Sequence, residues 1–152
     1  MTIPIYFATV TGNSRDLAER AERRLKALGF EVEARDLATE SADSLRGQRT
    51  ALFIVSTWGD GEPPDDAVDY VARLQSDEPL GLGGLQFSVC ALGDTGYEIF
   101  CGCGKTIDAR LEHHGAARLV DRADCDIDFI EPFEAWLGAV EQALAAHTAP
   151  VS

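Results

Sequence analysis

The sequence is poor in basic residues and has no long apolar run. Lys and Arg number 13 against 26 Asp and Glu, which gives a formal net charge of −13 over 152 residues. A surface this acidic repels nucleic acid and anionic lipid, so neither is expected as a partner. No apolar stretch approaches the roughly 20 residues that cross a bilayer, so we expect no membrane-spanning segment.

Cysteine is scarce and scattered. The spacing of the four cysteines indicates neither a disulfide framework nor a metal site; they are Cys90, Cys101, Cys103 and Cys125. The chain opens on an apolar strand pattern, with no basic leader and no long apolar stretch behind it, so we expect no secretory signal. We therefore expect a cytoplasmic protein with reduced thiols and no bound metal.

Strand patterns alternate with helical patterns along the chain. Strands are expected at Ile3–Ala8, Phe30–Ala34, Thr50–Ser56, Leu85–Leu92 and Ala117–Val120, and helices at Ser14–Leu28, Asp65–Leu74, Phe100–His113 and Phe129–Ala145. The polar link between residues 37 and 48 allows a short helix or none. Such alternation is typical of a parallel sheet with helices on both faces, and the length fits one domain over residues 1–152.

The loop after the first strand has the composition of a phosphate site. Ligands of doubly wound sheets bind beyond the carboxyl ends of the strands, at a topological switch point. This loop brings hydroxyls, an amide and a glycine to a helix N-terminus, which favours an anion; it consists of Thr9, Val10, Thr11, Gly12, Asn13 and Ser14. It has no Lys, which excludes the nucleoside-triphosphate loop, and the alternative reading is an ordinary helix cap.

The loops after the third and fourth strands each carry an aromatic ring and two glycines. The first of them contains Ser56, Thr57, Trp58, Gly59, Asp60 and Gly61, and the second contains Leu92, Gly93, Asp94, Tyr97, Phe100 and Cys101. Glycine lets the backbone approach a ligand closely, and Trp58 and Tyr97 could form the two walls of a slot. A flat ring that carries a phosphate, as FMN does, fits these loops, although Trp58 could simply cap the sheet edge.

These three loops resemble the FMN loops of the flavodoxin family, in the style of short stand-alone flavodoxins and of the FMN domains of diflavin reductases. The resemblance implies an α/β flavodoxin-like fold, a doubly wound five-stranded parallel sheet of order 2-1-3-4-5. It implies that the first loop binds the phosphate and that Trp58 and Tyr97 stack on the ring. An acidic residue after the last strand often contacts the ribityl chain in this family, and among Asp124, Asp126 and Asp128 we take Asp126.

The resemblance implies an electron carrier rather than an enzyme. It would shuttle single electrons from an NAD(P)H-dependent flavoprotein reductase to an acceptor redox protein. We expect a monomer that docks through an acidic rim of carboxylates in or beside the ring loops, namely Asp60, Glu62, Asp65, Asp66, Asp94 and Glu98. Two alternatives stay open: a flavin-dependent reductase of a small substrate such as a quinone, and a flavin-free interaction module with the same fold.

Overall fold

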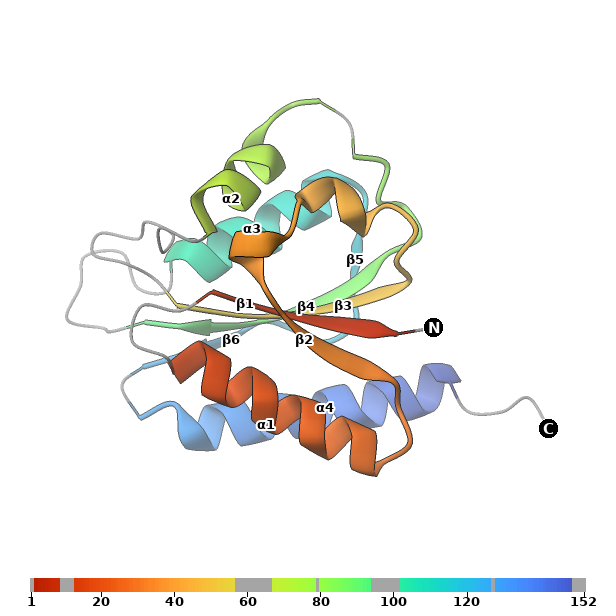
Figure 1. The fold of residues 1–152 in the computed structure, drawn as a ribbon, viewed down its shortest axis with the longest axis vertical. Helices are drawn as coiled ribbons and strands as arrows, with labels where there is room; N and C mark the ends of the chain where they lie inside the picture. Colours follow the sequence, from red (N-terminus) through yellow and green to blue (C-terminus); the bar gives the residue numbers. More distant parts are fainter. Residues whose placement is uncertain are drawn as a thin grey trace.

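Strands and helices alternate along the chain (Figure 1). The computed structural model describes residues 2–8, 13–56, 67–78, 80–93, 102–126 and 128–148. The strands are β1 (Ile3–Ala8), β2 (Val32–Asp36), β3 (Thr50–Ser56), β4 (Gln86–Leu92), β5 (Ala117–Arg118) and β6 (Ala123–Cys125). The helices are α1 (Asn13–Ala27), α2 (Val68–Gln75), α3 (Gly102–His113) and α4 (Ile130–Thr148), with the short 3-10 helices η1 (Leu37–Thr39) and η2 (Ala42–Leu45).

The strands form one parallel sheet of order β2-β1-β3-β4-β5, which confirms the predicted doubly wound topology. Strand β3 lies at the centre, between β1 and β4, and six of its seven residues are buried, as expected of a strand covered on both faces. Its carboxyl end lies beside those of β1 and β4, since Val55 pairs with Ala8 and Ser56 pairs with Leu92.

The outer edge beside β4 differs from the predicted single strand Ala117–Val120. Strand β5 ends at Arg118, and β6 resumes the pairing with β4 opposite Cys90. Between them, Ser88 Oγ donates to the Val120 carbonyl at 2.9 Å and accepts from Trp136 Nε1 at 2.8 Å. At this point the hydroxyl of Ser88 on β4, rather than a backbone group, bonds to the edge segment at Val120. The outer edge therefore consists of two short strands, β5 and β6.

Two helical layers enclose the sheet (Figure 1). Helices α1 and α4 cover one face, and α2 and α3 cover the other. Neighbouring strand residues alternate between the two cores: Tyr6 packs with α2 and α3, while Phe7 packs with α1 and α4. This alternation follows from the two-residue period of a strand.

The predicted helices are confirmed with small shifts at their ends. Helix α2 begins at Val68 rather than at Asp65, and Asp65 itself lies outside the described residues. The polar link folds into η1 and η2, whose first turns are capped by the side chains of Asp36 and Ser41. In the described part of the chain, no helix is both long and apolar enough to cross a membrane.

Candidate functional site

The candidate site lies at the carboxyl edge of β1, β3 and β4. Helix α1, the next helix after β1, covers one face of the sheet, and α2, the next helix after β3, covers the other. The point between β1 and β3 is therefore the topological switch point, where ligands of doubly wound sheets bind. Five of the six predicted site residues that the structure describes lie along this edge: Asn13, Ser14, Ser56, Leu92 and Gly93.

A pair of buried hydroxyls joins two of the predicted loops. Ser14 Oγ and Ser56 Oγ lie 2.6 Å apart, and Ser14 is fully buried while Ser56 is 8% exposed. Ser14 belongs to the first turn of α1, whose backbone N–H groups have no partner within the helix. Two hydroxyls, the first N–H groups of α1 and the positive end of this 15-residue helix thus lie together, and the sequence of residues 9–14 contains no Lys or Arg. This neutral donor set fits a phosphate group.

The start of the third loop is tied to the end of the last strand. Gly93 N–H donates to the Cys125 carbonyl at 2.9 Å, and Leu92 pairs with Cys125 in the sheet. Asp126, the sixth described site residue, follows Cys125 directly and is partly buried. The carboxylate of Asp124, by contrast, is held by Arg122, whose Nε lies 2.7 Å from Oδ1. These contacts bring Asp126 to the same edge as Gly93.

The other predicted site residues lie outside the described residues and stay predictions. They are Thr9, Val10, Thr11, Gly12, Thr57, Trp58, Gly59, Asp60, Gly61, Asp94, Tyr97, Phe100 and Cys101. The residues of the predicted acidic rim also lie outside the described residues. They are Asp60, Glu62, Asp65, Asp66, Asp94 and Glu98.

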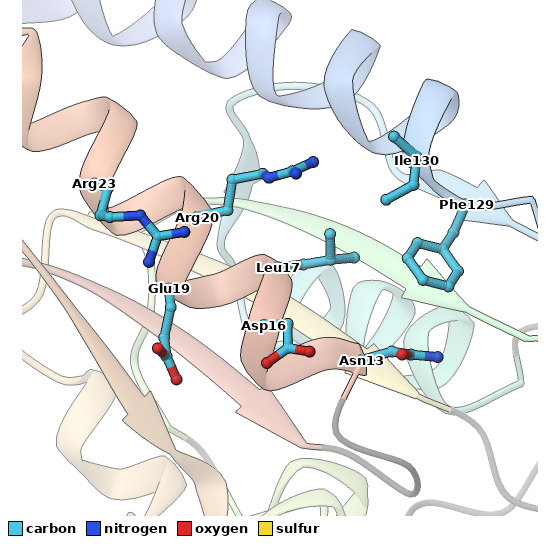
Figure 2. A pocket seen from close by; sticks show the side chains of 8 residues that line it. All are labelled: Asn13, Asp16, Leu17, Glu19, Arg20, Arg23, Phe129 and Ile130. Atoms are coloured by element: carbon cyan, nitrogen blue, oxygen red, sulfur yellow. The ribbon is translucent and has the colours of Figure 1, made fainter.

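A cavity of about 360 Å³ opens beside the site, between α1 and the start of α4. Figure 2 shows Leu17 and Arg20 reaching from α1 toward Phe129 and Ile130. Of the residues that line this cavity, Asn13 is the only one that also belongs to the predicted site. The cavity is therefore a neighbour of the switch point rather than the switch point itself.

Close packing fixes the start of α3, which follows the third loop. A Cβ placed on Gly104 would lie 2.2 Å from the Cβ of Ala91 on β4. Only glycine lets the first turn of α3 approach the end of β4 this closely. Sequence reasoning missed this residue, although a glycine inside a helical pattern, which normally weakens the helix, was a usable signal.

The described cysteines are core residues. Burial raises the pKa of Cys103 to about 12, so this thiol stays protonated at neutral pH. Cys90 and Cys125 are buried with their Sγ atoms 3.7 Å apart, and the hydrogen bond with Cys90 lowers the pKa of Cys125. In the described segments, no three His, Cys, Asp or Glu residues gather in a way that could hold a metal ion.

Comparison with known proteins agrees with this geometry. A family model described as flavodoxin matches residues 5–136. The chain belongs to the flavodoxin family. Flavodoxins bind FMN at the β1/β3 switch point, so the chain is an FMN-binding electron-transfer protein.

Both curated relatives and solved structures are similar to this flavodoxin. The sulfite reductase [NADPH] flavoprotein alpha-component of Bacillus subtilis (strain 168) is 39% identical over 142 residues, which is 93% of this chain and 24% of that protein. The same component from Neisseria meningitidis serogroup C (strain 053442) is 36% identical over 148 residues, 97% of this chain and 24% of that protein. The chain thus spans about a quarter of the length of the curated relatives it matches.

Two solved flavodoxins share the fold over nearly their whole length. The flavodoxin of Streptococcus pneumoniae TIGR4 has a TM-score of 0.83 and 29% identity, over 97% of this chain and 100% of that one. A point mutant of the flavodoxin from Pseudomonas aeruginosa has a TM-score of 0.80 and 26% identity, over 95% of this chain and 99% of that one.

Proposed function

We propose that this chain is a one-electron carrier that takes electrons from an NAD(P)H-dependent flavoprotein reductase and delivers them to an acceptor redox protein. The proposal depends on a bound FMN, and the observation that carries the FMN site is the buried Ser14–Ser56 hydroxyl pair at the first turn of α1, beside the end of β3. The relatives are named NADPH-dependent sulfite reductase flavoproteins, and this chain matches only about a quarter of each. That naming supports an NADPH-oxidising flavoprotein as the donor.

Each loop has its own part in holding FMN under this proposal. The N–H and hydroxyl groups of residues 9–14 donate to the phosphate, and the dipole of α1 stabilises its charge. Trp58 and Tyr97 would stack on opposite faces of the ring, and Gly59 and Gly93 would let the backbone approach its edge. Asp126 would accept hydrogen bonds from the ribityl hydroxyls. The bound flavin supplies the one-electron chemistry, while these residues set its orientation and its electrostatic surroundings.

Partner choice would follow from charge. The net charge of −13 attracts basic surfaces, and the acidic rim concentrates that charge around the ring loops. Steering of this kind raises the rate of encounter and weakens as salt screens it, with a Debye length of about 8 Å at physiological ionic strength. Under this proposal residues 1–152 form one domain that works as a monomer in the cytoplasm.

The experiment begins with binding and ends with electron delivery. FMN is added to the purified chain, and binding is followed by quenching of flavin fluorescence. The loaded protein is then mixed with NADPH alone and with NADPH plus a catalytic amount of a flavoprotein reductase. We expect bleaching of the flavin absorbance only in the second mixture, at a rate that falls as salt is raised.

Two outcomes would overturn the proposal. A chain that stays colourless after incubation with excess FMN would be the flavin-free module. A loaded chain that reduces a quinone with NADPH, without any reductase, would be an enzyme rather than a carrier.

A further inference from the structure

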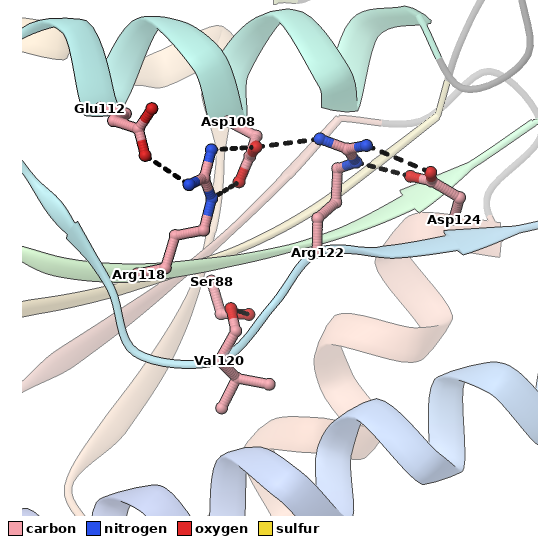
Figure 3. Close-up of polar contacts among 7 residues, drawn as sticks. All are labelled: Ser88, Asp108, Glu112, Arg118, Val120, Arg122 and Asp124. Carbon is pink, nitrogen blue, oxygen red and sulfur yellow. Dashed lines mark hydrogen bonds and ion pairs between the residues drawn. The ribbon is translucent and has the colours of Figure 1, made fainter.

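A buried carboxylate organises the split outer edge of the sheet. Asp108 lies in the middle of α3, and its side chain is only 3% exposed. Arg118 approaches it with two nitrogens, at 2.9 and 2.8 Å, and Arg122 adds a third contact at 2.9 Å (Figure 3). A buried carboxylate requires such partners, because an unpaired buried charge is strongly unfavourable.

The two arginines differ in what else they hold. Arg118 is the last residue of β5. It also pairs with Glu112 on α3, and its guanidinium lies over the Phe87 ring. Arg122 lies just before β6 and grips Asp124 with two nitrogens, at 2.7 and 3.3 Å. Figure 3 shows the Arg122 guanidinium between the carboxylates of Asp108 and Asp124. Arg122 is thus the cation that joins α3 to β6.

The strand held by Arg122 ends at the candidate site. Strand β6 has three residues and pairs with β4 from Cys90 to Leu92. At its end, the Cys125 carbonyl accepts from Gly93 N–H, and Asp126 follows. A three-residue edge strand has little stability of its own, because only one neighbour supplies its hydrogen bonds. The side-chain clamp to α3 therefore adds to the pairing with β4 and to the burial of Cys125 in holding the end of β6 beside Gly93.

We propose that Arg122 is a positioning residue for the FMN site: by clamping β6 to α3 it sets Gly93 and Asp126 against the flavin, and it neutralises the Asp124 carboxylate. This inference rests on the proposed function, in which Gly93 and Asp126 contact FMN. Without Arg122, the strand end loses its anchor and Asp124 loses its cation. A carboxylate without its counter-charge disfavours added electrons on the nearby ring, which makes the flavin harder to reduce.

The chain offers a matched control for this residue. Arg122→Ala and Arg118→Ala each remove one of the two arginines that pair with Asp108. Both changes should therefore lower the free energy of unfolding of the apoprotein, measured in urea, and Arg118→Ala should lower it at least as much, since Arg118 makes two bonds to Asp108 and also pairs with Glu112. Only Arg122 lies next to β6, so only Arg122→Ala should affect the flavin.

The expected result is a difference between the two variants in FMN binding and in potential. Arg122→Ala should raise the FMN dissociation constant about tenfold, by analogy with metal sites, where loss of a residue that orients a ligand costs about tenfold or more in affinity. It should also make the flavin midpoint potential more negative. Arg118→Ala should leave the dissociation constant within about twofold and the potential unchanged. Arg122→Lys keeps the charge without the forked geometry, so it should restore the potential more fully than the affinity.

Several outcomes separate the possible errors. Equal loss of affinity in Arg122→Ala and Arg118→Ala would reduce Arg122 to a stabilising residue and overturn the inference. Unchanged affinity and potential in Arg122→Ala would also overturn it while leaving the proposed function intact. If the unaltered chain binds no FMN, the proposed function fails and this inference fails with it. Should Arg122→Ala not fold, Arg122→Lys against Arg118→Lys gives the same comparison.

Discussion

Replacing Gly104 by Ala tests how closely α3 must approach the sheet. The new Cβ would lie 2.2 Å from the Cβ of Ala91 and 3.1 Å from its Cα. Carbon atoms in contact normally stay about 3.5–4.0 Å apart. Neither Cβ can rotate away, because the backbone fixes both. The first turn of α3 therefore has to move off β4.

The size of the effect follows from that distance. Restoring an ordinary contact needs a shift of about 1.3 Å at the start of α3. Overpacking of this kind costs about 1–3 kcal/mol, and the better helix propensity of Ala offsets up to about 1 kcal/mol. Because the backbone fixes both Cβ atoms, the overpacking cost should lie near the upper end of this range, and we expect Gly104→Ala to lower the free energy of unfolding by about 2 kcal/mol. Because α3 begins just after the third loop, FMN affinity should fall as well.

Urea unfolding of the apoprotein measures the first effect, and titration with FMN measures the second. Gly138→Ala in α4 is the control, since nothing lies within 4 Å of its added Cβ, and it should be neutral or stabilising. Ala91→Gly should partly rescue Gly104→Ala, which a double-mutant cycle would show as coupling between the two sites. If Gly104→Ala is as stable as the unaltered protein and binds FMN equally well, the packing argument is wrong.

Three further changes test other parts of the structure. Ser88→Ala leaves Trp136 Nε1–H and the Val120 carbonyl without their hydrogen-bond partner. It should lower the free energy of unfolding by about 1–3 kcal/mol, and an unchanged urea midpoint would contradict this. Ser14→Ala removes the hydroxyl that contacts Ser56 and should weaken FMN binding about tenfold, as measured by fluorescence titration. Equal affinity in the two proteins would show that the hydroxyl pair is not part of the phosphate site. Burial raises the pKa of Cys103 from 9.0 to about 12. Above about pH 9 the unfolded thiol therefore ionises while the folded thiol keeps its proton. The free energy of unfolding consequently falls as the pH rises from 9 to about 12. Cys103→Ala should flatten that fall by up to about 1.4 kcal/mol per pH unit, and an equal slope of stability against pH in both proteins would refute the assignment.

The sheet and its helices are largely predictable from local patterns. The apolar run of β3 and the three-to-four spacing on α1 each span enough residues to identify the element. The two-piece outer edge is not predictable in this way, because Ser88 on β4 and Trp136 on α4 set it from positions far away in the sequence. The sequence marks Ser88 only as a polar interruption of an apolar strand.

Part of the candidate site is likewise predictable from local patterns, and part of it is not. Ser14, Ser56 and Gly93 could be located because each borders a strand end or a helix start. The aspartates at 124, 126 and 128 look alike in the sequence, and the structure distinguishes Asp124 by its contact with Arg122 and Asp126 by its partial burial.

The broken outer edge bears on how the protein resists aggregation. A foreign strand joins a sheet along a continuous row of unpaired peptide groups. Pieces of two and three residues, flanked by the charges of Arg118 and Arg122, interrupt that row. At the opposite edge, β2 carries Glu33 and Arg35, and charged side chains likewise discourage strand addition. Both margins of the sheet are therefore poor templates for cross-β growth, even in a concentrated solution of the protein.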